Sequence, residues 1–122
     1  MDFDQTPHLL PDYGLLGIRG KDTTEFLQGV ITNDMGLLNN TAAIYAAHLT
    51  PQGRITADFL VTRLTEKSRT VLCLPRSVIL PLAKSLHTYA IGMDIEFEDL
   101  TDTYTIGLGT HPDAILTIAD PR

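Results

Sequence analysis

The chain has 122 residues, of which 43% are hydrophobic and 20% charged, and its formal net charge is −6. This length is enough for one domain that buries its own core without a metal or a disulfide. The acidic balance argues against a nucleic-acid platform, because binding to phosphates needs a basic surface.

Composition also bears on the compartment. No run reaches the length of about 20 apolar residues that a membrane span needs. The first four residues, Met-Asp-Phe-Asp, are acidic, whereas a secretory signal begins basic and continues apolar. The single cysteine, Cys73, rules out an internal disulfide and fits a reducing compartment. We therefore expect a cytoplasmic protein, or one of the mitochondrial matrix if the source is eukaryotic, with no membrane association.

The amino-terminal part of the chain predicts an arm, a strand and a helix. Residues 1–12 show little periodicity, so we expect a loose arm before a domain at 13–122. The apolar run 15–19 predicts the first strand. The segment 22–25 then has the spacing of a capping box, in which the Asp22 side chain accepts a backbone N–H of the first helical turn. The inner face of this helix is expected to carry Phe26, Leu27, Val30 and Ile31.

Two strands joined by a tight turn form the centre of the chain. Residues 42–49 predict one strand, and the Pro-Gln-Gly sequence at 51–53 predicts the turn. In the next strand, 55–63, the side chains alternate between two faces. We expect the core face to hold Ile55, Ala57, Phe59 and Val61. The other face is mixed, and could meet solvent, a partner domain or a ligand; it holds Thr56, Asp58, Leu60 and Thr62.

The second half of the chain repeats this order of elements. A strand at 70–74 precedes a helix that begins near Ser77 and ends before Gly92. Its inner stripe is expected to be Val78, Leu82, Leu86 and Tyr89. Further strands are expected at 95–97, 104–108 and 115–118. We therefore predict an α+β fold: one antiparallel-rich sheet with two helices on one face and a duplicated β-α-β-β half. One core should contain Phe26, Leu27, Phe59, Leu82 and Leu86.

Asp58 is the strongest candidate for chemistry. A carboxylate in the middle of a strand is disfavoured, so it needs exposure, a partner or a ligand. An ion pair with Arg54 or Arg63, or plain exposure, would explain it without any function. Asn33 and Asp34 are better explained as a turn that ends the first helix than as functional residues, because such side chains bond to nearby backbone groups.

The remaining reactive side chains predict neither a metal site nor a catalytic site. The histidines lack metal-ligand spacing; they are His8, His48, His87 and His111. Cys73 lies in an apolar strand, which favours a buried and inert thiol over a nucleophile. No Ser/His/Asp or Cys/His arrangement can be recognised from the spacing.

Five short motifs, in this order and spacing, carry a resemblance: Gly20-Lys21-Asp22, Phe26-Leu27-Gln28-Gly29, Thr32-Asn33-Asp34, Pro51-Gln52-Gly53-Arg54 and Leu74-Pro75-Arg76. The chain thereby resembles the amino-terminal part of the folate-binding YgfZ/aminomethyltransferase superfamily. This resemblance implies a tetrahydrofolate-binding scaffold of three domains around a central hole, of which this chain is the first and the remainder is absent. The candidate folate contacts that it implies are Tyr45, Arg54, Asp58, Asn33 and Asp34.

The two branches of the superfamily imply different functions. The T-protein of the glycine cleavage system transfers a methylene unit and carries two adjacent aspartates after the glycine turn, the first of them catalytic. The matching pair here is Ala57-Asp58, so aminomethyltransferase activity is not expected and no catalytic residue is assigned. The YgfZ-type branch supports assembly or repair of iron–sulfur clusters. A Lys-Gly-Cys segment, later in the protein than Arg122, identifies that branch.

The resemblance therefore implies a folate-binding domain of a YgfZ-type protein. Its expected ligand is tetrahydrofolate, and its expected partners are iron–sulfur client enzymes or assembly proteins. Two alternatives stay open: a fragment of an aminomethyltransferase-like enzyme, and an interaction domain that binds no folate.

Overall fold

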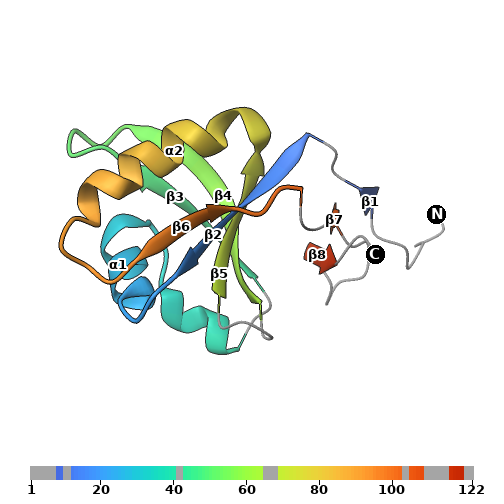
Figure 1. Cartoon of the computed structure of the whole chain (residues 1–122), viewed down its shortest axis with the longest axis horizontal. Coiled ribbons are helices and arrows are strands. Elements are labelled where there is room, and N and C mark those ends of the chain that lie inside the picture. Colours follow the sequence, from blue (N-terminus) through green and yellow to red (C-terminus); the bar gives the residue numbers. More distant parts are fainter. Residues whose placement is uncertain are drawn as a thin grey trace.

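The computed structural model describes residues 8–9, 12–40, 43–64, 69–102, 105–108 and 116–119. Two α-helices, one short 3-10 helix and eight strands follow one another in these residues (Figure 1). In chain order they are β1 (His8–Leu9), β2 (Tyr13–Arg19), α1 (Thr23–Val30), η1 (Met35–Asn39), β3 (Ala43–Leu49), β4 (Ile55–Leu64), β5 (Arg69–Pro75), α2 (Arg76–Tyr89), β6 (Glu96–Asp99), β7 (Thr105–Leu108) and β8 (Leu116–Ala119). The predicted α+β class is confirmed.

The strands form two sheets rather than the single sheet that was expected. The main sheet has five antiparallel strands in the order β3-β4-β5-β2-β6. The second has the order β1-β7-β8 and lies to one side of the main sheet (Figure 1). The predicted repeat of β-α-β-β is present along the chain, but its last strand, β7, pairs outside the main sheet. The expectation of one sheet was wrong because strand periodicity does not specify pairing partners.

The main sheet is built from two interleaved split β-α-β units. Strands β2 and β4, connected through α1, η1 and β3, are parallel to each other and flank β5. Strands β5 and β6, connected through α2, are likewise parallel and flank β2. This is the connectivity of ferredoxin-like folds, with β3 added at one edge.

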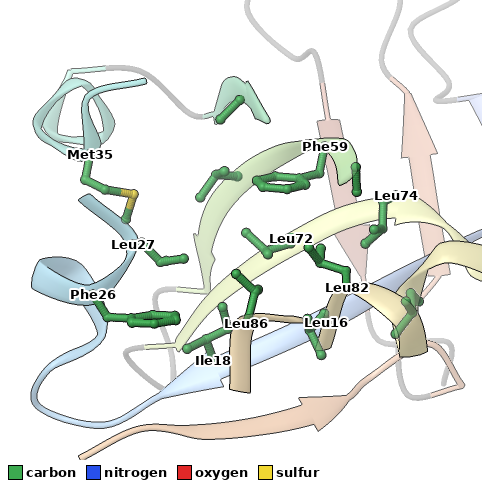
Figure 2. Packing of buried hydrophobic residues seen from close by; sticks show 14 of the residues in the cluster. Leu16, Ile18, Phe26, Leu27, Met35, Phe59, Leu72, Leu74, Leu82 and Leu86 are labelled. Atoms are coloured by element: carbon green, nitrogen blue, oxygen red, sulfur yellow. The ribbon is translucent and has the colours of Figure 1, made fainter. Parts of the chain in front are cut away.

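Both helices pack on the same face of this sheet, and the main core lies between them (Figures 1 and 2). The five residues predicted to share one core do so: Phe26, Leu27, Phe59, Leu82 and Leu86. Fully burying one such side chain contributes about 1.5–3 kcal/mol relative to leaving it exposed. The helices and the sheet therefore hold one another in place through this apolar layer.

The helix termini and stripes differ in detail from the prediction. Asp22 precedes α1 but makes no capping bond; its carboxylate accepts the N–H of Asp94, at 2.8 Å. Its main chain is not extended, as a capping residue normally is, and the loop before β6 offers a donor instead. In α2 the buried stripe is Ile79, Leu82 and Leu86, whereas Val78 is half-buried and Tyr89 is exposed.

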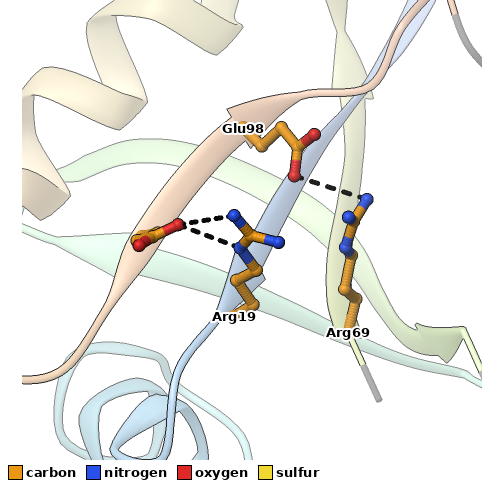
Figure 3. A network of polar contacts seen from close by, with 4 residues as sticks. Arg19, Arg69 and Glu98 are labelled. Carbon is orange, nitrogen blue, oxygen red and sulfur yellow. Dashed lines mark hydrogen bonds and ion pairs between the residues drawn. The ribbon is translucent and has the colours of Figure 1, made fainter. Parts of the chain in front are cut away.

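Strand β6 forms one edge of the main sheet, and two ion pairs connect it to β2 and to β5 (Figure 3). Arg19 on β2 contacts Glu96, with 2.8 Å between guanidinium and carboxylate. Arg69 on β5 reaches across β2 to Glu98, at 3.3 Å. Arg69 is largely buried, so its pair is screened less by solvent than the exposed pair of Arg19.

None of the described helices packs on the opposite face of the main sheet, which we call the helix-free face. A small second cluster of buried side chains lies there; it comprises Leu15, Val71, Cys73 and Leu100. Tyr13, Leu60 and Leu64 pack against this cluster and are only partly buried. The mixed face predicted for β4 belongs to this side of the sheet. The core face of β4 is as predicted except for Ile55, which is 67% exposed because it stands at the start of the strand, in the turn region.

Candidate functional site

A cavity of about 320 Å³ lies on the helix-free face of the main sheet. We call it the sheet cavity; its lining residues are Tyr13, Tyr45, Asp58, Phe59, Leu60, Cys73 and Pro75. They come from four adjacent strands, β3, β4, β5 and β2. Its volume lies at the lower end of the range of about 300–1,000 Å³ found for ligand pockets. The size suits the head group of a ligand rather than a whole large cofactor.

Strand register explains why these residues meet. Tyr45 lies opposite Leu60, and Leu60 lies opposite Cys73, so three neighbouring strands contribute one lateral row. Tyr13 lies opposite Pro75 at the next position of the β2–β5 pair. Side chains of residues that lie directly opposite each other on adjacent strands point to the same face of the sheet. Leu60 and Cys73 therefore form an apolar floor, with the phenols of Tyr45 and Tyr13 on either side of it.

The Tyr45 hydroxyl donates a hydrogen bond to Oδ2 of Asp58 within this cavity. Tyr45 lies opposite Leu60 and Asp58 opposite Ala47, so the two side chains meet along a diagonal between β3 and β4. The bond to the Asp58 carboxylate raises the pKa of the Tyr45 phenol, and desolvation and the negative charge of Asp58 add to this effect. The pair therefore presents a charged acceptor beside an uncharged phenol at neutral pH.

The partner of Asp58 is therefore Tyr45, and neither of the arginines near it in the sequence forms an ion pair with it among the described residues. Arg63 donates to Oδ1 of Asn39, at 3.3 Å. Arg54 stands in the turn before β4, and the part of the chain that the structure describes gives its guanidinium no ion pair. Arg54 is exposed and does not line the sheet cavity. The second oxygen of Asp58, Oδ1, has no partner among the described residues and can accept a bond from a ligand.

Position 57 faces the other way. Ala57 is 7% exposed and belongs to the core beneath the helices. The alternation of β4 places position 58 on the open face and position 57 in the apolar layer. Of the Ala57-Asp58 pair, the residue that can meet a ligand on the helix-free face is therefore Asp58.

Asn33 and Asp34 lie near this pair but bond to the backbone. The Asn33 amide donates to the carbonyl of Tyr45, at 2.9 Å, and its oxygen accepts the N–H of Asp34, at 2.7 Å. The Asp34 carboxylate accepts the N–H of Gly36, at 2.8 Å, and so caps η1. Neither residue lines the sheet cavity. These contacts agree with the interpretation of 32–34 as a turn that follows the first helix.

Cys73 lies in the floor of the sheet cavity but is almost fully buried. Its side chain is 1% exposed, and burial raises the pKa of the thiol to about 11. At neutral pH it is therefore a protonated, apolar group and not a nucleophile. The predicted burial of the thiol is confirmed.

His48 lies on the helix-covered side, next to a second cavity of about 290 Å³. Its Nδ1 is 2.9 Å from the Val30 carbonyl and its Nε2 is 3.2 Å from the Ser85 hydroxyl. The ring also packs edge-on against Tyr89, and the residue is 1% exposed. Both nitrogens are occupied, so His48 acts as a packing residue, as predicted. His87 contacts Phe97 at the surface; His111 and the side chain of His8 lie outside the described residues.

The sequence did not indicate Tyr13, Cys73 or Pro75 as lining residues of a site. Their signal is the period of two along β2 and β5, which puts Tyr13 and Leu15 on one face and Cys73 and Pro75 on the same face. Continuous apolar runs in both strands hide that period. Only the strand pairing shows which face lacks a helix.

Two negative findings apply to the described ranges alone. No group of three or more His, Cys, Asp or Glu side chains there could hold a metal ion. No helix there is long and apolar enough to cross a membrane.

Residues 12–108 match the profile of the GCVT N-terminal domain. The chain is 32% identical over 101 residues to the tRNA-modifying protein YgfZ of Hamiltonella defensa, covering 82% of this chain and 29% of that protein. It is 25% identical over 108 residues to the mitochondrial iron–sulfur cluster assembly factor IBA57 homolog of Mycosarcoma maydis, covering 80% of this chain and 27% of that protein.

A solved structure shares the fold. The glycine cleavage system aminomethyltransferase T from Bartonella henselae superimposes with a TM-score of 0.68 over 97% of this chain and 30% of its own length, at 20% identity. The chain therefore spans less than a third of each of these three proteins.

Proposed function

Because the chain belongs to the family of GCVT N-terminal domains, we propose that it is the tetrahydrofolate-binding first domain of a YgfZ-type protein that supports iron–sulfur cluster assembly or repair. The observation that carries this proposal is the sheet cavity, with the Tyr45–Asp58 pair at its side. The similarity to YgfZ and to the IBA57 homolog supports the choice of branch.

The residues of the sheet cavity fit the pterin ring of tetrahydrofolate. Its pyrimidine half is flat and carries adjacent N–H donors on its outer edge, whereas its reduced half is puckered. Leu60 and Pro75 offer an apolar surface against which such a ring can lie, and Tyr13 and Tyr45 flank it. Oδ1 of Asp58, which has no partner among the residues that the structure describes, can accept one N–H in a charge-assisted bond that is stronger than one between neutral groups.

We place Tyr45 and Asp58 in direct contact with the pterin and Arg54 further out, at the turn before β4. An exposed guanidinium at this turn suits the carboxylates of the glutamate tail of a folate. Asn33 and Asp34 support the site from behind β3. In this proposal the cluster is the cargo of partner proteins, and the domain works in the cytoplasm or the mitochondrial matrix.

The sheet cavity is shallow for a whole folate, so the isolated chain should bind weakly. A site that covers only one side of a ligand leaves the other side in water. We expect a dissociation constant for tetrahydrofolate of about 1 mM, which corresponds to about −4 kcal/mol. Micromolar affinity of the 122-residue chain alone would contradict the proposal that other domains complete the site.

The test compares charge-matched variants by equilibrium dialysis with tetrahydrofolate under anaerobic conditions. Asp58→Asn should weaken binding at least fivefold, because the charged acceptor is lost. Glu25→Gln is the control: it removes the same charge from an exposed position on α1, on the other side of the sheet. Equal affinity of both variants would reduce Asp58 to a structural partner of Tyr45.

A second candidate function is aminomethyl transfer, and the position of Asp58 favours it. The carboxylate that faces the sheet cavity is present, although it stands one position after the alanine that matches the catalytic aspartate. The assay is glycine-dependent methylene transfer to tetrahydrofolate by the parent protein. Robust turnover would establish the enzyme and refute the YgfZ-type assignment.

A further inference from the structure

Strand β3 forms an edge of the main sheet, and the Tyr45 phenol projects from it. Edge strands present unpaired N–H and C=O groups and are more easily displaced than central strands. The Tyr45–Asp58 bond runs diagonally between β3 and β4, so it exists only while β3 keeps its register. Hydrogen bonds on the outer side of β3 would therefore help to keep this register.

Thr32 and Asn33 occupy that outer side. The N–H of Thr32 donates to the carbonyl of Ala47, at 2.9 Å, and the N–H of Ala47 donates to the Thr32 hydroxyl, at 3.0 Å. The Asn33 amide donates to the carbonyl of Tyr45, at 2.9 Å. Thr32 and Asn33 thus bond to three outward backbone groups of β3. Two of these three bonds come from side chains, which take the place of a neighbouring strand.

The segment itself is fixed at both ends. Before it, Ile31 forms an isolated antiparallel bridge with His48. After it, the Asn33 oxygen accepts the N–H of Asp34, and the N–H of Met35 donates to Gln28, at 2.8 Å. The Asn33 amide is therefore held by a donor on one side and an acceptor on the other, which fixes its orientation.

We propose that Thr32 and Asn33 are positioning residues for the Tyr45–Asp58 pair: they fasten the outer edge of β3 and thereby keep the phenol on the carboxylate. Ala47, which Thr32 holds, is the residue directly opposite Asp58, and Tyr45, which Asn33 holds, carries the phenol. The value of this arrangement for folate binding rests on the proposed function; the geometric claim about the pair does not.

Asn33→Asp tests the role of the amide with almost no change of shape. The new oxygen can still accept the N–H of Asp34, but the group that faces the Tyr45 carbonyl no longer donates and repels it instead. Thr32→Val tests the hydroxyl, because valine keeps the shape and the backbone N–H. Asn40→Asp is the control, since it introduces the same charge at an exposed position after η1.

Two readouts follow the pair in the 122-residue chain. The first is the pKa of the Tyr45 phenol from carbon-13 NMR of labelled tyrosine, assigned with Tyr45→Phe. The second is the hydrogen-exchange rate of the Ala47 amide at pH 7. In both test variants we expect the phenol pKa to fall toward its usual value of about 10 and the Ala47 amide to exchange about fivefold faster or more.

The sign of the pKa change separates positioning from electrostatics. A carboxylate introduced at position 33 would, by its charge alone, raise the pKa of a nearby phenol. A fall in Asn33→Asp can therefore come only from loosening of the Tyr45–Asp58 bond. An unchanged or raised pKa, with unchanged exchange of Ala47, would refute the role of Asn33. The same result in Thr32→Val would refute the role of Thr32. The experiment contains no folate, so its failure and the failure of the proposed function are separate outcomes.

Discussion

Ala57→Asp places a carboxylate in the core beneath the helices, and its cost can be worked out from the structure. Position 57 is 7% exposed and lies within the main apolar cluster. Its cross-strand neighbour, His48, already uses both ring nitrogens, so the new group meets no unpaired donor there. Burial of this kind raises the pKa of a carboxyl by about 3 units. At about 1.4 kcal/mol per unit, the charged form costs the fold about 4 kcal/mol.

This cost depends on pH in a defined direction. The pKa of the introduced carboxyl is higher in the folded than in the unfolded chain, so the folded state binds more protons and stability falls as pH rises. Near pH 4 the loss of stability should be only that of burying a neutral carboxyl without a partner, about 1–3 kcal/mol, and the further cost of the charged form should reach its full size above pH 7. For a domain of this length, about 4 kcal/mol lowers the melting temperature by about 15 °C.

Thermal unfolding followed by circular dichroism at pH 4 and pH 7.5 is the assay. Ile55→Asp is the control, because it adds the same charge to the same strand at a position that is 67% exposed; it should change stability by less than about 1 kcal/mol. If Ala57→Asp melts like the wild type at both pH values, position 57 faces solvent and the assigned register of β4 is wrong.

Three further predictions concern the core, the thiol and the phenol. Leu86→Ala should lower the free energy of unfolding by about 3 kcal/mol in urea titrations, because the side chain is fully buried between α2 and the sheet; a loss below about 1 kcal/mol would place α2 elsewhere. Cys73 should resist thiol reagents at pH 8 until the chain unfolds, and stability should fall as pH rises from the ordinary thiol value of 9.0 to about 11, since the folded state holds the proton more tightly; rapid labelling of the native chain would contradict its burial. Asp58→Asn should lower the pKa of the Tyr45 phenol toward 10.0, as the bond that chiefly raises it is lost, and NMR titration would show an unchanged pKa if the pair does not form in solution.

The sequence was sufficient to predict the elements and most of the core. Alternation along β4 identified Phe59 and Val61 as buried, and helical spacing identified Leu82 and Leu86. Both signals are local, because they depend on residues two to four positions apart. The error at Val78 and Ile79 has the same origin, since adjacent apolar residues leave the phase of a helix uncertain by one position.

The pairing of the strands could not be predicted in this way. Neither the second sheet nor the edge position of β3 has a local signature, because each depends on partners far apart in the chain. Asp22, which precedes α1, shows the same limit: its local pattern was that of a capping box, but its carboxylate accepts the N–H of Asp94, 72 positions later. Tertiary partners override a local preference that is worth only about 1 kcal/mol.

Some residues of the candidate site could be predicted from local sequence signals, and others depend on strand pairing. Asp58 could be recognised because a carboxylate on a strand is locally anomalous, and the resemblance to the family added Tyr45. Tyr13 and Pro75 could not, since nothing local distinguishes them from other residues at the end of an apolar strand. Their inclusion follows from the β2–β5 register and from the absence of a helix on that face among the described elements.

The most direct test of the proposed function is to map where a folate contacts this chain. Nitrogen-15 and carbon-13 NMR spectra would be recorded during titration with the stable analogue 5-formyltetrahydrofolate to several millimolar. The largest shift changes should fall on the helix-free face, at Tyr13, Tyr45 and Leu60, and should weaken in Asp58→Asn. Changes gathered on the α1–α2 side, or none at the highest concentration, would contradict a folate site in the sheet cavity.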